Sequence, residues 1–202
     1  MTQIQEPAFL PIDKAREYLV AEINSLRHIK GTVWVYVCAA TMLDYLASLS
    51  IGAPAKRQNY IDFIRDHMRP AYKNFEYARQ HQKPGTGSIP SEMTKQDLPE
   101  QMYYMLRCGL VHGFSLVPTQ KELLNGGRDR SITINSRADA LKDEKTHLEP
   151  FNKPPLINDS VYFVDEDLLD DLVAAVNHLF ADVTKHPKIK KRLMERPFIW
   201  PL

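Results

Sequence analysis

The 202-residue sequence has only two cysteines and almost no net charge. Cys38 and Cys108 both lie in apolar stretches. Two thiols are too few for a disulfide framework, and these two lack a paired metal-ligand spacing. We therefore expect a reducing, cytoplasmic setting. The first residues contain no basic segment followed by an apolar run, so we expect no signal peptide.

The charged residues nearly cancel, with 26 Lys and Arg against 25 Asp and Glu, for a formal net charge of +1. This balance argues against a uniformly basic protein that coats nucleic acid, and against an acidic tail. A local basic groove is still compatible with it, because net charge averages over the whole surface. Hydrophobic residues make up 44% of the chain, which is enough for the core of one domain over residues 1–202.

Common enzyme signatures are lacking as well. The sequence has no glycine-rich phosphate loop, no Gly-x-Ser-x-Gly elbow and no His-Glu-x-x-His motif. Six histidines are scattered without a metal-like partner at close spacing: His28, His67, His81, His147, His178 and His186. We interpret each of these as a surface or packed side chain, and we predict no metal site and no cofactor.

One apolar run approaches the length of a membrane span. Residues 33–51 carry a single charge, Asp44, over nineteen positions. That charge and the hydroxyls of Thr41 and Ser48 oppose a spanning helix, so we expect a buried central helix and no membrane partner. Residues 33–37 are rich in β-branched and aromatic side chains typical of a strand, but their unbroken apolar continuation favours a helix.

Apolar periodicity predicts a mainly all-α fold, with a change of composition near its middle. Asp13 is a candidate N-cap, Gly52 should end the second helix, and Pro70 should end or bend the third. The predicted helices cover about 13–30, 33–51, 58–75, 98–114 and 165–183, and the glycines and prolines of residues 80–90 predict a loop.

Residues 116–164 form an irregular insert before the last predicted helix. Within it, residues 131–135 and 160–164 have the pattern of short strands, which we expect to pair as a hairpin across a long loop. The C-terminal tail, about 184–202, begins with the most basic run of the chain. We interpret it as a solvated face or frayed end, with phosphate contacts as the alternative.

The segment 103–114 places one guanidinium, that of Arg107, and one imidazole, that of His112, in an otherwise apolar helix. A charge on a buried face is costly unless it is paired. Asp44, the only charge of the apolar helix, is the partner that we predict within the fold. One interpretation is therefore a structural Arg107–Asp44 ion pair, with His112 at the end of the helix.

An arginine followed after four residues by a histidine, near the end of a helix, resembles the motif of the HEPN family of helical domains. The resemblance extends over roughly residues 13–183. It implies an antiparallel helical bundle with a small β-hairpin insert before the last helix. It also implies homodimers that cleave RNA without a metal, often in toxin–antitoxin or phage-defence systems with an antitoxin or another protein partner. Arg107 and His112 would then be catalytic, with Asp44 and Cys108 as supporting residues.

The sequence departs from the family pattern at two positions. Cys108 stands where active members commonly have a small polar residue such as Asn, and Phe114 stands where some family toxins carry a tyrosine that a partner enzyme modifies. Because of the first departure, two alternatives stay open. One is a non-catalytic module that binds RNA, nucleotide or protein, and the other is a purely structural interaction protein. The second gives no support to control by a nucleotidyltransferase.

The chemistry of RNA cleavage fits the two motif residues. A histidine titrates near neutrality and acts as base or acid, and an arginine stays charged and binds phosphate oxygens. On an ideal α-helix a five-residue separation corresponds to a rotation of about 140°, so Arg107 and His112 do not share a face unless the helix loosens. A two-fold dimer would bring two motifs into one cleft.

Overall fold

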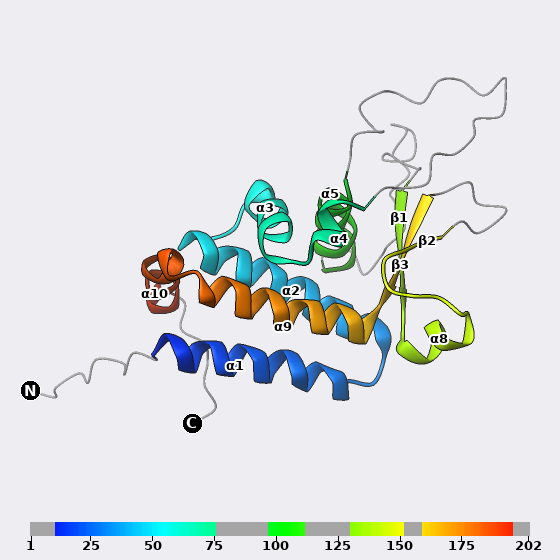
Figure 1. Ribbon diagram of the computed structural model, residues 1–202, viewed down its shortest axis with the longest axis horizontal. Helices are drawn as coiled ribbons and strands as arrows, with labels where there is room; N and C mark the ends of the chain where they lie inside the picture. Colours follow the sequence, from blue (N-terminus) through cyan, green and yellow to red (C-terminus); the bar gives the residue numbers. More distant parts are fainter. Residues whose placement is uncertain (1–10, 76–96, 112–129, 152–158, 196–202) are drawn as a thin grey trace, which may run out of the picture.

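The computed structural model describes residues 11–75, 97–111, 130–151 and 159–195. These residues form a mainly helical fold with one small sheet, which confirms the predicted class. Helices α2 (Thr32–Ile51) and α9 (Asp165–Ala181) lie side by side at its centre, and α1 (Ile12–Ser25) packs along α9. The sheet stands at the end of α9 where that helix begins (Figure 1).

Helix α1 matches the predicted periodicity. Its buried residues are Ala15, Leu19 and Ile23, and a short 3₁₀ turn, η1 (Leu26–His28), follows it. The N-cap prediction was wrong, since Pro11 precedes the helix and Asp13 lies within its first turn. An acidic residue in that turn still interacts favourably with the positive end of the helix dipole.

Helix α2 is continuous from Thr32 to Ile51, so the strand alternative for its first residues is excluded. By length and composition alone it would suffice to cross a membrane, with a mean hydropathy of 1.4 over its 18-residue window. However, 56% of that window is buried inside the fold. There α2 packs against α9 and against three further segments, α3 (Arg57–His67), α10 (His186–Glu195) and η3 (Tyr103–Leu110). Burial within the bundle accounts for its apolar sequence.

Gly52 ends α2 as predicted. It adopts a left-handed conformation with φ +69°, and the Ala53 N–H donates to the carbonyl of Ser48 at 3.2 Å, which is the Schellman arrangement. A β-carbon at residue 52 would lie 3.0 Å from the carbonyl oxygen of Lys188 in α10 (His186–Glu195). Gly52 therefore permits both the turn and the close approach of α10.

We expect Gly52→Ala to lower the free energy of unfolding by at least about 1–2 kcal/mol, the cost of a left-handed non-glycine residue. Gly31→Ala is the comparison, because Gly31 also has a positive φ of 106° but its added β-carbon would make only an ordinary 3.6 Å contact. Urea denaturation should show a larger loss in the free energy of unfolding for Gly52→Ala than for Gly31→Ala. Equal losses would mean that the approach of Lys188 carries no cost.

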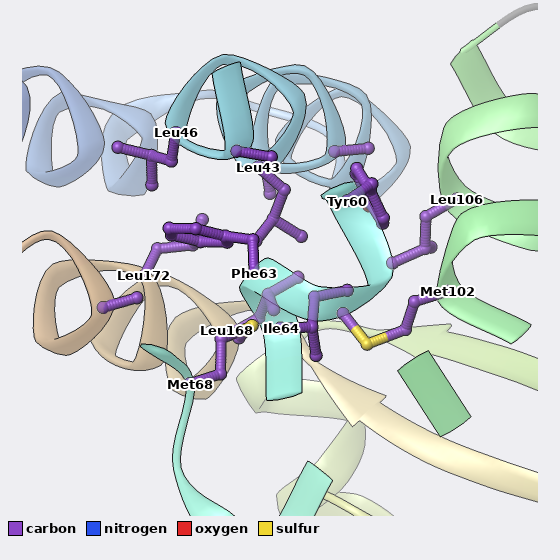
Figure 2. Packing of buried hydrophobic residues seen from close by; sticks show 14 of the residues in the cluster. Leu43, Leu46, Tyr60, Phe63, Ile64, Met68, Met102, Leu106, Leu168 and Leu172 are labelled. Atoms are coloured by element: carbon purple, nitrogen blue, oxygen red, sulfur yellow. The ribbon is translucent and has the colours of Figure 1, made fainter. Parts of the chain in front are cut away.

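Helices α3 (Arg57–His67) and α4 (Pro70–Lys73) cover α2 and α9. Pro70 starts α4, so the predicted interruption at this proline is confirmed. The predicted apolar face of α3 is buried, and Figure 2 shows Tyr60, Phe63 and Ile64 of that helix pointing between α2, α9 and the segment that carries Leu106. This is the main core of the bundle.

His67, the last residue of α3, is buried with no hydrogen-bond partner for Nδ1 among the described residues. It stacks on Phe63 and meets the ring of His178 edge-on at 5.0 Å. Burial lowers its pKa from 6.5 to about 4. His178 and Lys185 act in the same direction, and Asp66 and Asp182 oppose them. His67 is therefore neutral in the fold at neutral pH.

We expect this histidine to make the fold sensitive to acid. Above pH 6.5 it is neutral in both states, whereas between pH 6.5 and 4 the unfolded chain binds the proton more tightly and stability falls as pH falls. The loss should reach about 2 kcal/mol by pH 5. His67→Phe should flatten the pH dependence of denaturation, and His178→Gln, at an exposed position, should preserve most of it. Equal pH dependence in wild type and His67→Phe would refute this assignment.

The sheet contains β1 (Arg130–Asn135), β2 (Glu149–Phe151) and β3 (Asp159–Val164), in the order β1-β3-β2. The two predicted strands, β1 and β3, do pair, but in parallel, so the predicted hairpin between them was wrong. Their connection holds α8 (Arg137–Lys142), and parallel neighbours require such a crossover. The antiparallel neighbour of β3 is the unpredicted strand β2.

The C-terminal region departs from the prediction of a frayed tail. After α9 comes the short turn η4 (Val183–Lys185), and then α10, which packs on α2 and α1. Ile189 and Leu193 are buried there, and their burial anchors the helix. The predicted helix 165–183 is confirmed by α9, with Leu168, Leu172, Val176 and Leu179 in the core.

Candidate functional site

The motif segment begins as the predicted helix and then changes its hydrogen-bonding pattern. Asp97 caps α5 (Leu98–Met102) by accepting a hydrogen bond from the Glu100 N–H at 3.1 Å, and Arg65 of α3 binds the same carboxylate at 2.6 Å. From Tyr103 to Leu110 the chain is a π-helix, η3. Such segments, with hydrogen bonds between residues five apart, are rare and often occur at functional sites.

The predicted partner of Arg107 is confirmed. Arg107 Nε donates to Asp44 Oδ1 at 2.8 Å, which joins η3 to the middle of α2. The two side chains are 26% and 34% exposed, so the pair lies at the surface of the bundle rather than in its core. The hydrogen bond that Arg107 donates to Asp44 raises the pKa of Arg107 above its ordinary value. The guanidinium is therefore permanently charged, held in place and within reach of solvent.

The guanidinium lies over one aromatic ring, which in turn contacts a second. Arg107 Cζ lies 5.4 Å from the ring centre of Tyr103, a cation–π distance, and Tyr103 meets Tyr60 edge-on at 5.6 Å. Tyr60 is fully buried, and its hydroxyl has no hydrogen-bond partner among the residues that the structure describes. Burial raises the pKa of Tyr60 strongly, and the Asp44 carboxylate adds to this effect.

Cys108 is half-buried next to Arg107. It lies beside Tyr103, whose pKa is raised first by burial and then by this thiol. The structure thus brings together three of the four predicted site residues, Asp44, Arg107 and Cys108. The fourth, His112, lies outside the described residues, as do Phe114 and the predicted loop 80–90.

The π-helix changes one premise of the sequence analysis. The separation of about 140° between Arg107 and His112 assumed α-helical geometry. Over Tyr103–Leu110 the hydrogen-bonding repeat is instead five residues, which equals the spacing of the motif. The estimate of about 140° therefore does not apply within Tyr103–Leu110, whereas His112 lies beyond that segment and outside the described residues.

Comparisons with protein-family models, with curated proteins and with solved structures found no match. The function must therefore be argued from the residues and their geometry alone.

A second polar cluster, which the sequence analysis missed, lies where α4, α9 and the sheet meet. The Tyr72 hydroxyl donates to Asp171 Oδ2 at 2.7 Å and lies 2.9 Å from His147 Nε2. The Val164 N–H donates to His147 Nδ1 at 2.8 Å, so the ring proton is on Nε2 and points to Tyr72 and Asp171. Arg69 Nε binds the same carboxylate oxygen at 3.0 Å.

This cluster is buried and mutually satisfied. The His147 side chain is 3% exposed and that of Asp171 is 10% exposed, and Tyr72 is fully covered. A buried network whose members bind one another fixes the packing around it. We therefore interpret it as the connection that holds the sheet on the bundle. Among the described residues, no three His, Cys, Asp or Glu side chains are arranged to hold a metal ion.

Proposed function

We propose that this chain is a HEPN-like endoribonuclease that acts as a cytoplasmic homodimer, with Arg107 and His112 of each subunit at a shared cleft. The observation that carries the proposal is the setting of Arg107, a charged and partly exposed side chain that Asp44 orients from the middle of α2. Asp44 accepts its bond from Nε, so in this proposal the phosphate binds at the two terminal nitrogens of the guanidinium.

In this mechanism Arg107 binds the scissile phosphate and stabilises the charge that develops on it. His112 removes the proton of the 2′-hydroxyl, whose oxygen attacks the phosphorus while the 5′-oxygen leaves. The leaving oxygen needs a proton, and the second histidine of a two-fold dimer supplies it. The π-helical segment that carries Arg107 supports a functional role for this region, since such segments often occur at functional sites, and the HEPN resemblance supports cleavage without a metal.

The same resemblance suggests a role in a toxin–antitoxin or phage-defence system, with an antitoxin as the protein partner. A toxin of this kind should arrest growth when it is expressed without its partner. Genes beside the coding sequence that encode a small companion protein would support this part of the proposal.

The test is cleavage of end-labelled single-stranded RNA by the purified protein in the presence of EDTA. We expect wild type to cleave and Arg107→Ala and His112→Ala each to lose at least about 100-fold in rate, the cost of removing one transition-state donor or the general base. Mass photometry should detect a dimer. Unchanged cleavage by either variant would contradict the proposal.

The second candidate is a non-catalytic module in which Arg107 has only a structural role. The 2.8 Å bond from Arg107 to Asp44 favours it, as does Cys108 at a position that is commonly polar in active family members. It predicts that purified wild type leaves RNA intact, with or without binding it. The same labelled RNA therefore separates the two candidates.

A further inference from the structure

Helix α10 presents its lysines on a rigid support. Ile189 is fully buried and Leu193 nearly so, while Lys188, Lys190 and Lys191 are exposed. Since each residue of an α-helix turns by about 100°, Lys188 and Lys190 flank Ile189 on either side and Lys191 points away from it. The three ammonium groups therefore fan outward over the solvent side of one anchored helix.

These lysines have little part in ion pairs within the described residues. Among the described residues, Lys188 and Lys190 have no carboxylate partner, and Lys191 has only Glu195, with 3.9 Å between Nζ and Oε1. Both side chains of that pair are largely exposed, so it contributes little. In a chain with a net charge of only +1, this helix is a local concentration of free positive charge.

The basic helix lies close to the Arg107 site along α2. Gly52, against which the Lys188 backbone packs, is eight residues beyond Asp44, or about 12 Å at 1.5 Å per residue. This stretch of α2 is as long as roughly 3–4 nucleotides at about 3.4 Å per nucleotide of a stacked strand, and the exposed lysine side chains lie beyond it. Arg192 of α10 also lies near Tyr45 of α2. Burial raises the pKa of Tyr45 to about 12, and the positive charge of Arg192 opposes this rise.

We propose that Lys188, Lys190 and Lys191 of α10 bind the phosphates of an RNA strand whose scissile phosphate lies at Arg107. This inference rests on the proposed function and names the surface that holds its substrate. Lysines bind phosphates whatever the base sequence, so they would fix the position of the RNA strand without reading its bases. An anionic membrane is disfavoured, since the apolar side of α10 is packed into the bundle and is not available for insertion into lipid.

The test compares two full-length triple variants with the same change of charge. One is Lys188→Gln/Lys190→Gln/Lys191→Gln. The control is Lys30→Gln/Lys73→Gln/Lys142→Gln, at three exposed positions away from α10. Affinity for a 20-nucleotide 2′-O-methyl RNA, which lacks the attacking hydroxyl, is measured by fluorescence anisotropy at several salt concentrations.

We expect the α10 variant to bind at least about 10-fold more weakly than wild type at low salt. The slope of log Kd against log salt should fall by about 2, since each phosphate contact on a single strand contributes about 0.7. The control should behave as wild type. Equal binding by the two variants would overturn the inference, as would lysine-dependent binding of phosphatidylserine vesicles but not of RNA. Cleavage of ordinary RNA by wild type is measured in parallel. If wild type cleaves but the lysines do not contribute to binding, only this inference fails. If wild type does not cleave, the proposed function itself fails.

Discussion

Replacing Asp171 by alanine should lower the free energy of unfolding by about 3–5 kcal/mol, the usual cost of breaking a buried charged network. The carboxylate is the common acceptor for Tyr72, His147 and Arg69. Its removal leaves the buried Tyr72 hydroxyl without its acceptor and takes away the carboxylate 3.4 Å from His147 Nε2, and a buried orphan of this kind costs more than the bond itself contributes. The expected fall in Tm is about 6–20 °C for a chain of this length.

Asp170 offers a matched control one residue away on the same helix. Its side chain is 64% exposed and pairs with Arg27 of the 3₁₀ turn η1. An exposed pair of this kind is worth about 1 kcal/mol or less, so Asp170→Ala should shift Tm by only a few degrees. Thermal denaturation followed by circular dichroism gives both values. If Asp171→Ala lost no more stability than Asp170→Ala, the buried cluster would not be what holds the sheet to the bundle.

Arg107→Ala should separate activity from stability. The Arg107–Asp44 pair is partly exposed, so its loss should cost about 1 kcal/mol or less and leave the protein folded. Transition-state stabilisation by the guanidinium has no substitute in the alanine variant, so the cleavage rate should fall by at least about 100-fold. Arg107→Lys restores the charge without the planar fork and should recover only part of that rate.

Asp44→Asn completes this experiment. The amide retains an oxygen that accepts the Arg107 hydrogen bond but removes the negative charge, so we expect a small change in Tm and an intermediate cleavage rate. A purely structural pair would behave differently: Arg107→Ala and Asp44→Asn would both lower Tm, and neither would affect binding or cleavage of RNA. Parallel measurements of Tm and rate on the same preparations distinguish these patterns.

The sequence predicted the parts of the fold that depend on local periodicity. The buried faces of α1, α3 and α9 follow from apolar residues three and four apart, and the burial of α2 follows from its unbroken apolar run. Asp44 was predictable as the partner of Arg107 because each is an isolated charge in an apolar helix. Pairing the two residues needed only the rule that a charge leaving water must be compensated.

The features that the sequence did not predict depend on contacts between distant segments. Tyr72 is separated from His147 by 75 positions and from Asp171 by 99, so no local spacing marks them as one cluster. The parallel pairing of β1 with β3 was missed because α8 is only six residues long and lies within a polar stretch. The π-helix has the same apolar pattern as an α-helix, and only its backbone hydrogen bonds distinguish it.

The arrangement around α2 also has a consequence for synthesis of the chain. This apolar helix is complete at residue 51, but α9, which packs along it, ends only at residue 181. At about 5–20 residues per second, translation of the intervening 130 residues takes roughly 6–26 s. During that interval α2 emerges from the ribosome before α9 and α10, two of the helices that cover it, are complete. The nascent chain should therefore depend on chaperones more strongly than the finished fold would suggest.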